Sequence, residues 1–128
     1  MFKKQIIKLM NLPLNDYGNA ERLKEMFGTR WVYLPRYKCW MYWDRYSWKG
    51  KATIEFRRAA AKAFLLLAKE ISCLPPAKDN YEQLHRTKVL EWLEASQFEA
   101  RLKAVNAIFR GMCMDDYGKA CPSYINVG

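Results

Sequence analysis

Residues 30–51, RWVYLPRYKCWMYWDRYSWKGK, constrain the fold of this chain more than any other stretch. They hold eight aromatic residues, six Lys or Arg and a single acid, Asp44. The runs RWVYLP and KCWMYW are aromatic and β-branched with two turn residues between them, which predicts an antiparallel hairpin over residues 31–48, of two or three strands. Alternation places apolar or aromatic side chains on both faces. Because a two-stranded ribbon is marginally stable alone, one face must pack on helices, and we expect the other to carry exposed rings.

Two helices that could provide this packing flank the hairpin. The stretch LNDYGNAERLKEMFG predicts a short helix with Asn15 or Asp16 as its N-cap and Gly28 after its last residue. Residues 53–73 form the clearest helix, with Thr53 as a fair N-cap and apolar residues recurring at helical spacing. Pro75-Pro76 would end it.

Two further helices are predicted in the second half of the chain. One begins at Asp79, and its core residues are expected to be Leu84, Val89, Trp92 and Leu93. The other is opened by Ser96, since SQFE has the form of a capping box. Its apolar residues at helical spacing are Phe98, Leu102, Val105, Phe109 and Met112.

These elements predict an α+β fold that is mainly α-helical, with about four helices and a small antiparallel β-hairpin inserted after the first helix. A chain of 128 residues is most simply one domain. Within it we expect a flexible start over residues 1–14, a helical domain over 15–115, and a tail or the start of a connector over 116–128.

The net charge of +9 is concentrated in one half of the chain. Residues 1–62 hold fourteen Lys or Arg against five Asp or Glu, whereas residues 63–128 hold eight of each. A one-sided positive field attracts polyanions such as nucleic acid or anionic lipid headgroups. A solubilising surface charge is the alternative, but the interleaving of these cations with aromatic residues favours a polyanionic partner.

Enzyme chemistry has little support in the sequence, so we expect a non-catalytic protein without cofactor or metal. The four cysteines include no C-x-x-C pair, and His85 has no cysteine near it, which argues against zinc. WKGKAT lacks the spacing of a phosphate-binding loop. The absence of a signal peptide or a long apolar run predicts reduced cysteines, a cytoplasmic location in a bacterial host cell and no membrane partner.

The hairpin combines the two ingredients of single-strand binding, which are rings that stack on unpaired bases and cations that neutralise phosphates. We expect Trp31, Trp43 and Trp48 to pack in the core and Tyr37 to be exposed at the hairpin tip. The predicted nucleic-acid-binding residues are Arg36, Tyr37, Lys38, Tyr42, Arg45, Tyr46, Lys49, Lys51, Arg57 and Arg58.

The same region resembles the N-terminal helical domain of phage, plasmid and poxvirus primase-helicases, which precedes a superfamily 3 helicase module. The resemblance is carried by a G-N-A-E-R-L element at 18–23, by Arg30, Tyr33 and Pro35, and by a hairpin motif with Trp40, Trp43, Asp44 and Trp48. It covers residues 15–115 and is specific mainly within 16–48. Where the family has Gly after the Asp, this chain has Arg45, which places a cation at the turn. The residues for ATP hydrolysis and primer synthesis are not present.

The resemblance and the charge pattern together predict a non-catalytic accessory domain of a mobile-element DNA replication primase-helicase. It would bind single-stranded or forked DNA through the basic aromatic hairpin and aid helicase loading or assembly, with a helicase or primase as a protein partner. The alternative is a protein-binding module or a phage-encoded inhibitor that docks its aromatic, basic face on a partner protein, because Trp, Tyr and Arg also dominate protein interfaces.

Overall fold

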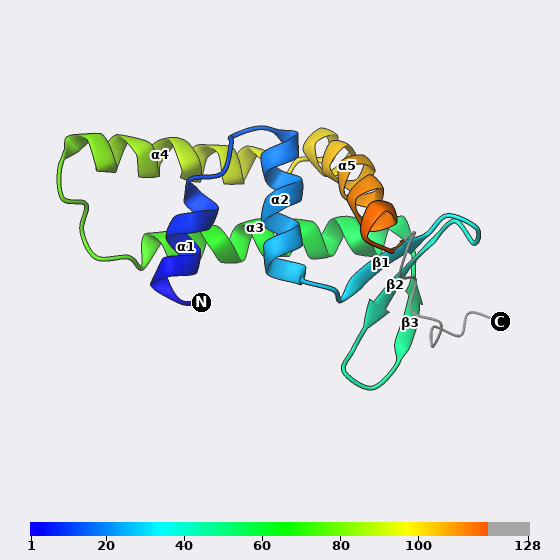
Figure 1. The fold of residues 1–128 in the computed structure, drawn as a ribbon. Coiled ribbons are helices and arrows are strands. Elements are labelled where there is room, and N and C mark those ends of the chain that lie inside the picture. The colour runs from blue at the N-terminus through cyan, green and yellow to red at the C-terminus, as the bar shows by residue number, and fades with distance from the viewer. Residues whose placement is uncertain (118–128) are drawn as a thin grey trace.

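The computed structural model describes residues 1–117, with side chains up to residue 113. In this part of the chain the elements follow in the order α1 (Lys3–Met10), α2 (Asp16–Phe27), β1 (Trp31–Leu34), β2 (Cys39–Trp43), β3 (Trp48–Lys51), α3 (Thr53–Ser72), α4 (Asn80–Ala95) and α5 (Glu99–Tyr117) (Figure 1). The predicted α+β, mainly α fold is confirmed, with five helices in these residues instead of four and a sheet of three strands. The tail expected from residue 116 is helical as far as Tyr117, and the rest of it lies outside the described residues.

The start of the chain corrects one prediction, because residues 1–14 are not a loose segment. Helix α1 covers Lys3–Met10 and buries Ile6, Leu9 and Met10 in the main core. A helix of eight residues is marginal in water by itself, and its stability comes from the surface against which it packs. The short, broken apolar pattern of this stretch therefore did not reveal the helix.

The three strands form an antiparallel sheet in the order β1-β2-β3. Trp31 lies opposite Tyr42, and Tyr42 lies opposite Lys49 on β3. Directly opposed residues share a face of the sheet, so one face carries Trp31, Tyr33, Trp40, Tyr42, Lys49 and Lys51. The four aromatic residues of this face pack into or against the main core with α3 and α5, as the sequence required.

The outer face of the sheet differs from the prediction, because it carries no row of exposed rings. Val32, Leu34 and Met41 are buried there in a second, small apolar cluster, with Cys39 and Trp48 packed against it. Trp43 is half-buried, belongs to neither cluster and lies 5.5 Å from Trp48, ring centroid to centroid. The prediction that Trp43 is a core residue is therefore wrong, and Trp48 is only partly buried.

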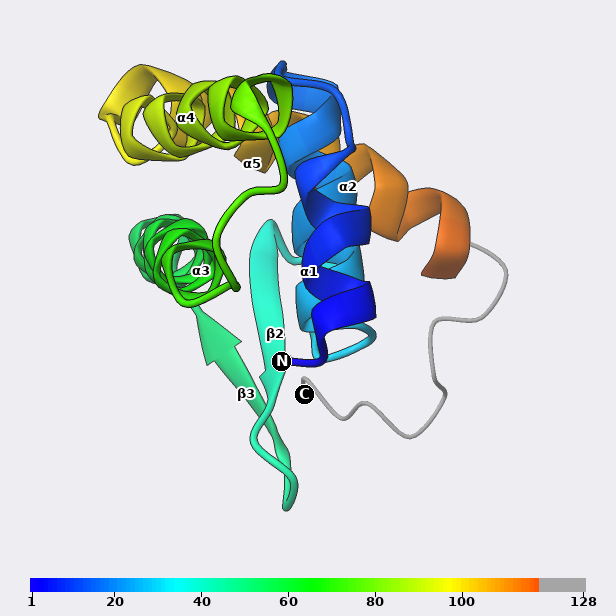
Figure 2. The ribbon, with the colours of Figure 1, turned by 90° about the vertical axis from the view of Figure 1, so that its left-hand side faces the viewer.

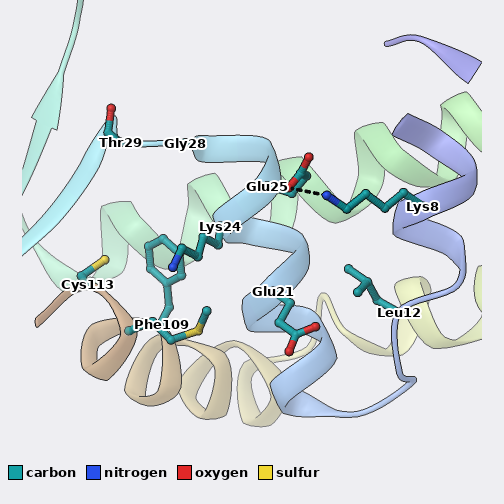
Figure 3. Close-up of a pocket in the computed structure, with 10 residues that line it drawn as sticks. Lys8, Leu12, Glu21, Lys24, Glu25, Gly28, Thr29, Phe109 and Cys113 are labelled. Carbon is teal, nitrogen blue, oxygen red and sulfur yellow. Dashed lines mark hydrogen bonds and ion pairs between the residues drawn. The ribbon is translucent and has the colours of Figure 1, made fainter. Parts of the chain in front are cut away.

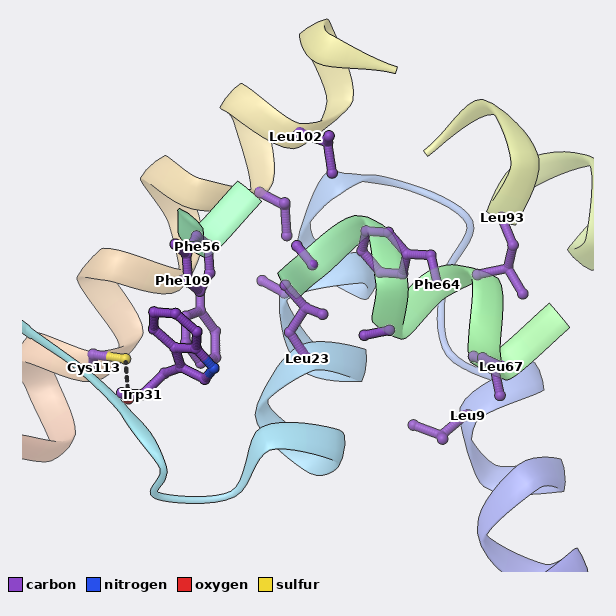
Figure 4. Packing of buried hydrophobic residues seen from close by; sticks show 14 of the residues in the cluster. Leu9, Leu23, Trp31, Phe56, Phe64, Leu67, Leu93, Leu102, Phe109 and Cys113 are labelled. Atoms are coloured by element: carbon purple, nitrogen blue, oxygen red, sulfur yellow. Dashed lines mark hydrogen bonds between the residues drawn. The ribbon is translucent and has the colours of Figure 1, made fainter. Parts of the chain in front are cut away.

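The main core draws side chains from all five helices and from β1 and β2. Figure 4 shows an aromatic end with Trp31, Phe56 and Phe109 and an aliphatic end with Leu9 and Leu67. The predicted burial of Trp31 is confirmed at 6 % exposure.

Trp40 is the largest fully buried side chain of the described residues. Its ring stacks on Phe56 with centroids 4.0 Å apart and planes 4° apart, and its Nε1 donates to Asn106 Oδ1 at 3.1 Å. These two contacts tie the middle strand to both α3 and α5.

Several helix ends follow the sequence, and two do not. Asn15 caps α2 by accepting from Gly18 N at 2.7 Å, Gly28 follows α2 with a φ of 61°, and Asp79 caps α4. Ser96, in contrast, ends α4, and its Oγ donates to Trp92 O instead of capping α5. The prediction that Thr53 is an N-cap is wrong, because Thr53 is the first residue of α3 and Ala52 stands at the N-cap, where its backbone N–H donates to Glu55 Oε2 at 2.9 Å.

Two predicted core residues of α4 and the following turn are exposed, namely Leu84 at 54 % and Phe98 at 66 %. Burial of Val89, Leu93, Leu102, Val105 and Phe109 is confirmed. Both exceptions lie near a helix start, Leu84 early in α4 and Phe98 directly before α5.

Candidate nucleic-acid interface

The structure divides the ten predicted binding residues into groups and does not bring all of them together. The β1–β2 turn holds Arg36, Tyr37 and Lys38, the β2–β3 turn holds Arg45 and Tyr46, the helix-facing side of the sheet carries Tyr42, Lys49 and Lys51, and α3 carries Arg57 and Arg58. The two turns lie at opposite ends of β2, a strand of five residues that spans roughly 17 Å. Figures 1 and 2 show β2 and β3 extending beyond the helices toward the β2–β3 turn.

The β1–β2 turn presents an exposed ring between two cations. Tyr37 is 51 % exposed, and the guanidinium of Arg36 lies 5.9 Å from the centroid of its ring. Lys38 has a φ of 50°, in the left-handed region that Gly or Asn usually occupies. The expected exposure of Tyr37 is confirmed.

The β2–β3 turn is organised by Asp44. Its Oδ1 accepts from the backbone N–H groups of Tyr46 and Ser47, each at 2.9 Å, and its Oδ2 pairs with Lys49 Nζ at 2.9 Å. The Lys49 hydrogen bond, followed by the two backbone hydrogen bonds, lowers the pKa of Asp44 from 3.8 to about 2. Tyr46 is consequently fixed at its backbone while its side chain is 88 % exposed.

Arg45 occupies the position at which a glycine would be free of strain. Its φ is 83°, which most side chains avoid. Both turns of the sheet therefore hold a basic residue in a left-handed conformation, and strained backbone of this kind clusters at functional sites.

The remaining predicted residues differ in how accessible they are. Tyr42 is half-buried, with its ring 4.9 Å from that of Trp31, while Lys51 is also half-buried. Arg58 is exposed on α3. Arg57 is half-buried, and its Nε is buried without a hydrogen-bond partner among the described residues.

Arg57 also has an acidic neighbour on α5. The pKa of Glu99 is lowered first by its hydrogen bond from Lys103, with a smaller contribution from the charge of Arg57. Arg57 is therefore near the start of α5 and less accessible than Arg58.

The G-N-A-E-R-L element that carries the family resemblance has a structural role. Arg22 is fully buried and donates to the carbonyl oxygens of Leu9 at 3.0 Å, Leu12 at 2.7 Å and Pro13 at 2.8 Å. Burial lowers its pKa from 12.5 to about 10, which leaves it charged at neutral pH. The Leu9 carbonyl at the C-terminal end of α1 carries partial negative charge that stabilises this cation, and the other two carbonyls belong to the loop that follows α1.

Asn19 extends the same network to the C-terminal end of α4. Its Nδ2 donates to Ser96 Oγ at 2.9 Å, and its Oδ1 accepts from Trp92 Nε1 at 2.9 Å. Asn19 and Arg22 therefore join α1, α2 and α4, and neither is available to a ligand.

The sequence missed two cations that lie beside the aromatic face of the sheet, Arg30 and Lys62. Both line a hollow of about 280 Å³ together with Trp31 and Tyr42. Lys62 follows Arg58 by one helical turn on α3. This i, i+4 spacing places the two cations on the same side of the helix, so it could have added Lys62 to the predicted binding residues. Arg30 directly precedes β1, and its guanidinium lies 5.5 Å from the centroid of the Tyr42 ring.

A larger hollow of about 590 Å³ lies along α2, between α1 and α5 (Figure 3). Its lining includes Lys8 and Lys24 but also Glu21 and Glu25, and Lys8 Nζ pairs with Glu25 at 3.2 Å. Mixed and internally paired charge does not favour an anionic ligand, so this hollow has no evident link to the basic hairpin.

No helix among residues 1–117 is long and apolar enough to cross a membrane, and no three His, Cys, Asp or Glu side chains of that part come together to hold a metal ion. Comparisons of the chain with protein-family models, curated proteins and solved structures found no match. The likeness to the primase-helicase domain therefore stays a resemblance of residues.

Proposed function

We propose that this chain is a non-catalytic, nucleic-acid-binding domain that contacts single-stranded or forked DNA. In line with the resemblance, it would serve as an accessory domain of a mobile-element primase-helicase and aid helicase loading or assembly. The observation that carries the proposal is the clustering of rings and cations at one end of the sheet. Tyr42, Arg45, Tyr46 and Lys49 lie there, with Arg30 beside them.

This end of the sheet suits a single strand for two physical reasons. Exposed and half-exposed rings on a fixed backbone offer faces for unpaired bases, with little conformational entropy left to lose. Cations beside them neutralise phosphates and release counterions. The β1–β2 turn, with Tyr37 and Lys38, offers a second contact to a more distant part of the bound nucleic-acid strand.

The test is a salt titration of binding to a fluorescently labelled oligonucleotide, followed by anisotropy. For single strands the logarithm of the association constant should fall linearly with the logarithm of salt concentration, with a slope of about −0.7 per phosphate neutralised. Lys38→Ala should reduce the slope by about that amount. The control is Lys88→Ala, which removes an exposed cation from α4 and should leave the slope unchanged.

Absence of binding at about 50 mM salt, or affinity that does not respond to salt, would refute this function. In that event a protein-binding role becomes the better hypothesis. Its structural support is the apolar outer side of α3, where Leu65 and Leu66 are 43 % and 48 % exposed.

A further inference from the structure

The hollow between the end of α2, the sheet and α3 has the composition of a nucleotide site. Three rings line it, those of Phe27, Trp31 and Tyr42, and Arg30 and Lys62 stand at its walls. Its volume of about 280 Å³ falls just below the ~300–1,000 Å³ of small-molecule pockets, which suits a ligand the size of one base.

The rings that line this hollow are supported by the main core. Trp31 is 6 % exposed and packs edge-on against Phe56, with centroids 5.3 Å apart. Phe27 and Tyr42 lie 6.0 Å and 4.9 Å from Trp31 by ring centroids. An aromatic surface already fixed by the core needs no ordering when a ligand arrives, which favours binding.

The charge of the hollow is positive and complements a phosphate. Among the described residues that line it, Arg30 and Lys62 are the charged ones, and neither Asp nor Glu is present. Lys49 lies opposite Tyr42 on the neighbouring strand and adds a third cation at the edge, although it pairs with Asp44. The lack of acidic residues in its lining distinguishes this hollow from the larger one along α2, which is lined by both lysines and glutamates.

We propose that this hollow binds one unstacked base of a nucleic-acid strand, with the adjoining phosphate held by Arg30 and Lys62. The proposal rests on the nucleic-acid-binding function and names its central contact. In the free protein the guanidinium of Arg30 lies over the Tyr42 ring at 5.5 Å. A base takes that position and Arg30 turns to the phosphate, because base–aromatic stacking is stronger than an exposed cation–π contact.

The experiment compares two labelled oligonucleotides of equal length and charge, oligothymidine and its fully abasic counterpart. Tyr42→Leu should weaken binding of oligothymidine by about 5- to 150-fold, the range that loss of one base stack predicts, and should leave the abasic affinity unchanged. Tyr42→Phe keeps the ring and should bind like the wild type. Lys62→Ala should weaken both oligonucleotides and lower the salt slope by about 0.7.

A second measurement uses the unmodified protein, so it does not depend on how the variants fold. An oligonucleotide containing 5-iododeoxyuridine is cross-linked by light, and the attached residue is identified by mass spectrometry. Cross-links to Tyr42 or Trp31 support the proposal. Cross-links confined to Tyr37 or Tyr46, or equal binding of oligothymidine by wild type and Tyr42→Leu, overturn it while the general function stands. Failure of the wild type to bind either oligonucleotide overturns both.

Discussion

The burial of Trp40 predicts that this tryptophan, and not Trp43, is indispensable to the fold, although both lie on β2 three residues apart. Truncating a buried Trp to Ala typically costs about 3–5 kcal/mol. Trp40→Ala also leaves the amide oxygen of Asn106 buried without its partner, which adds about 1–3 kcal/mol. Against a total stability of about 5–15 kcal/mol, this variant should lose a large part of its free energy of unfolding.

Trp40→Phe allows the same contact to be measured in a folded protein. It keeps a ring against Phe56 but removes Nε1, so we expect about 1–3 kcal/mol from the unpaired oxygen of Asn106 and a further cost for the space left by the smaller ring. Trp40→Phe combined with Asn106→Leu should regain about 1 kcal/mol or more, because replacing both partners of a buried hydrogen bond by apolar groups is nearly neutral.

The matched control is Trp43→Ala. Trp43 is half-buried and its main contact is the ring of Trp48 at 5.5 Å, so we expect about 1–2 kcal/mol. Urea unfolding followed by far-UV circular dichroism measures the free energy of unfolding of all four variants. If the slope of this free energy against urea concentration is unchanged, each variant still unfolds in two states. The reasoning is refuted if Trp43→Ala costs as much as Trp40→Ala, or if Asn106→Leu fails to improve Trp40→Phe.

Three further substitutions and one pH titration test the packing of α2 and α5 and the geometry of the β2–β3 turn. Gly18→Ala should destabilise the fold by about 1–3 kcal/mol, because its methyl group would collide with a backbone carbonyl of the preceding loop. Gly111→Ala, where an added methyl meets open space, should instead stabilise by about 0.5–1 kcal/mol, and equal thermal shifts for the two would contradict the packing. The pKa of Asp44 is lowered to about 2, so its carboxylate stabilises the turn above pH 3.8 and loses this effect as the pH falls toward 2. An NMR titration of that carboxyl group with a midpoint near 3.8 would disprove this account. Arg45→Gly should raise stability by about 1 kcal/mol, since glycine adopts a φ of 83° without strain, yet lower the salt slope of oligonucleotide binding; unchanged binding would show that the cation at this turn has no role.

How much of the fold the sequence predicts depends on the range of the interactions involved. Helix α2 begins and ends where Asn15 and Gly28 indicate, and α3 ends before the two prolines. Alternation within the hairpin also placed its residues correctly on two faces. These features depend on neighbours within a few residues of each other, so the local sequence contains the information.

The tertiary structure decided which side chains are buried and which partners they meet, because both depend on how separate helices and strands pack together. Alternation could not say which face of the sheet meets α3 and α5, and that choice buries Trp40 and leaves Trp43 half-exposed. Arg22 belongs to a motif that suggested family membership, and only the folded chain brings three carbonyls to its guanidinium.

The candidate site shows the same division. Its cations and rings near the turns were identifiable from composition, whereas the hollow at Tyr42 joins Arg30 to Lys62, which are 32 residues apart in sequence. A long-range contact of this kind forms only when separate elements pack, because the free energy that holds it comes from burial in the shared core and not from the local chain.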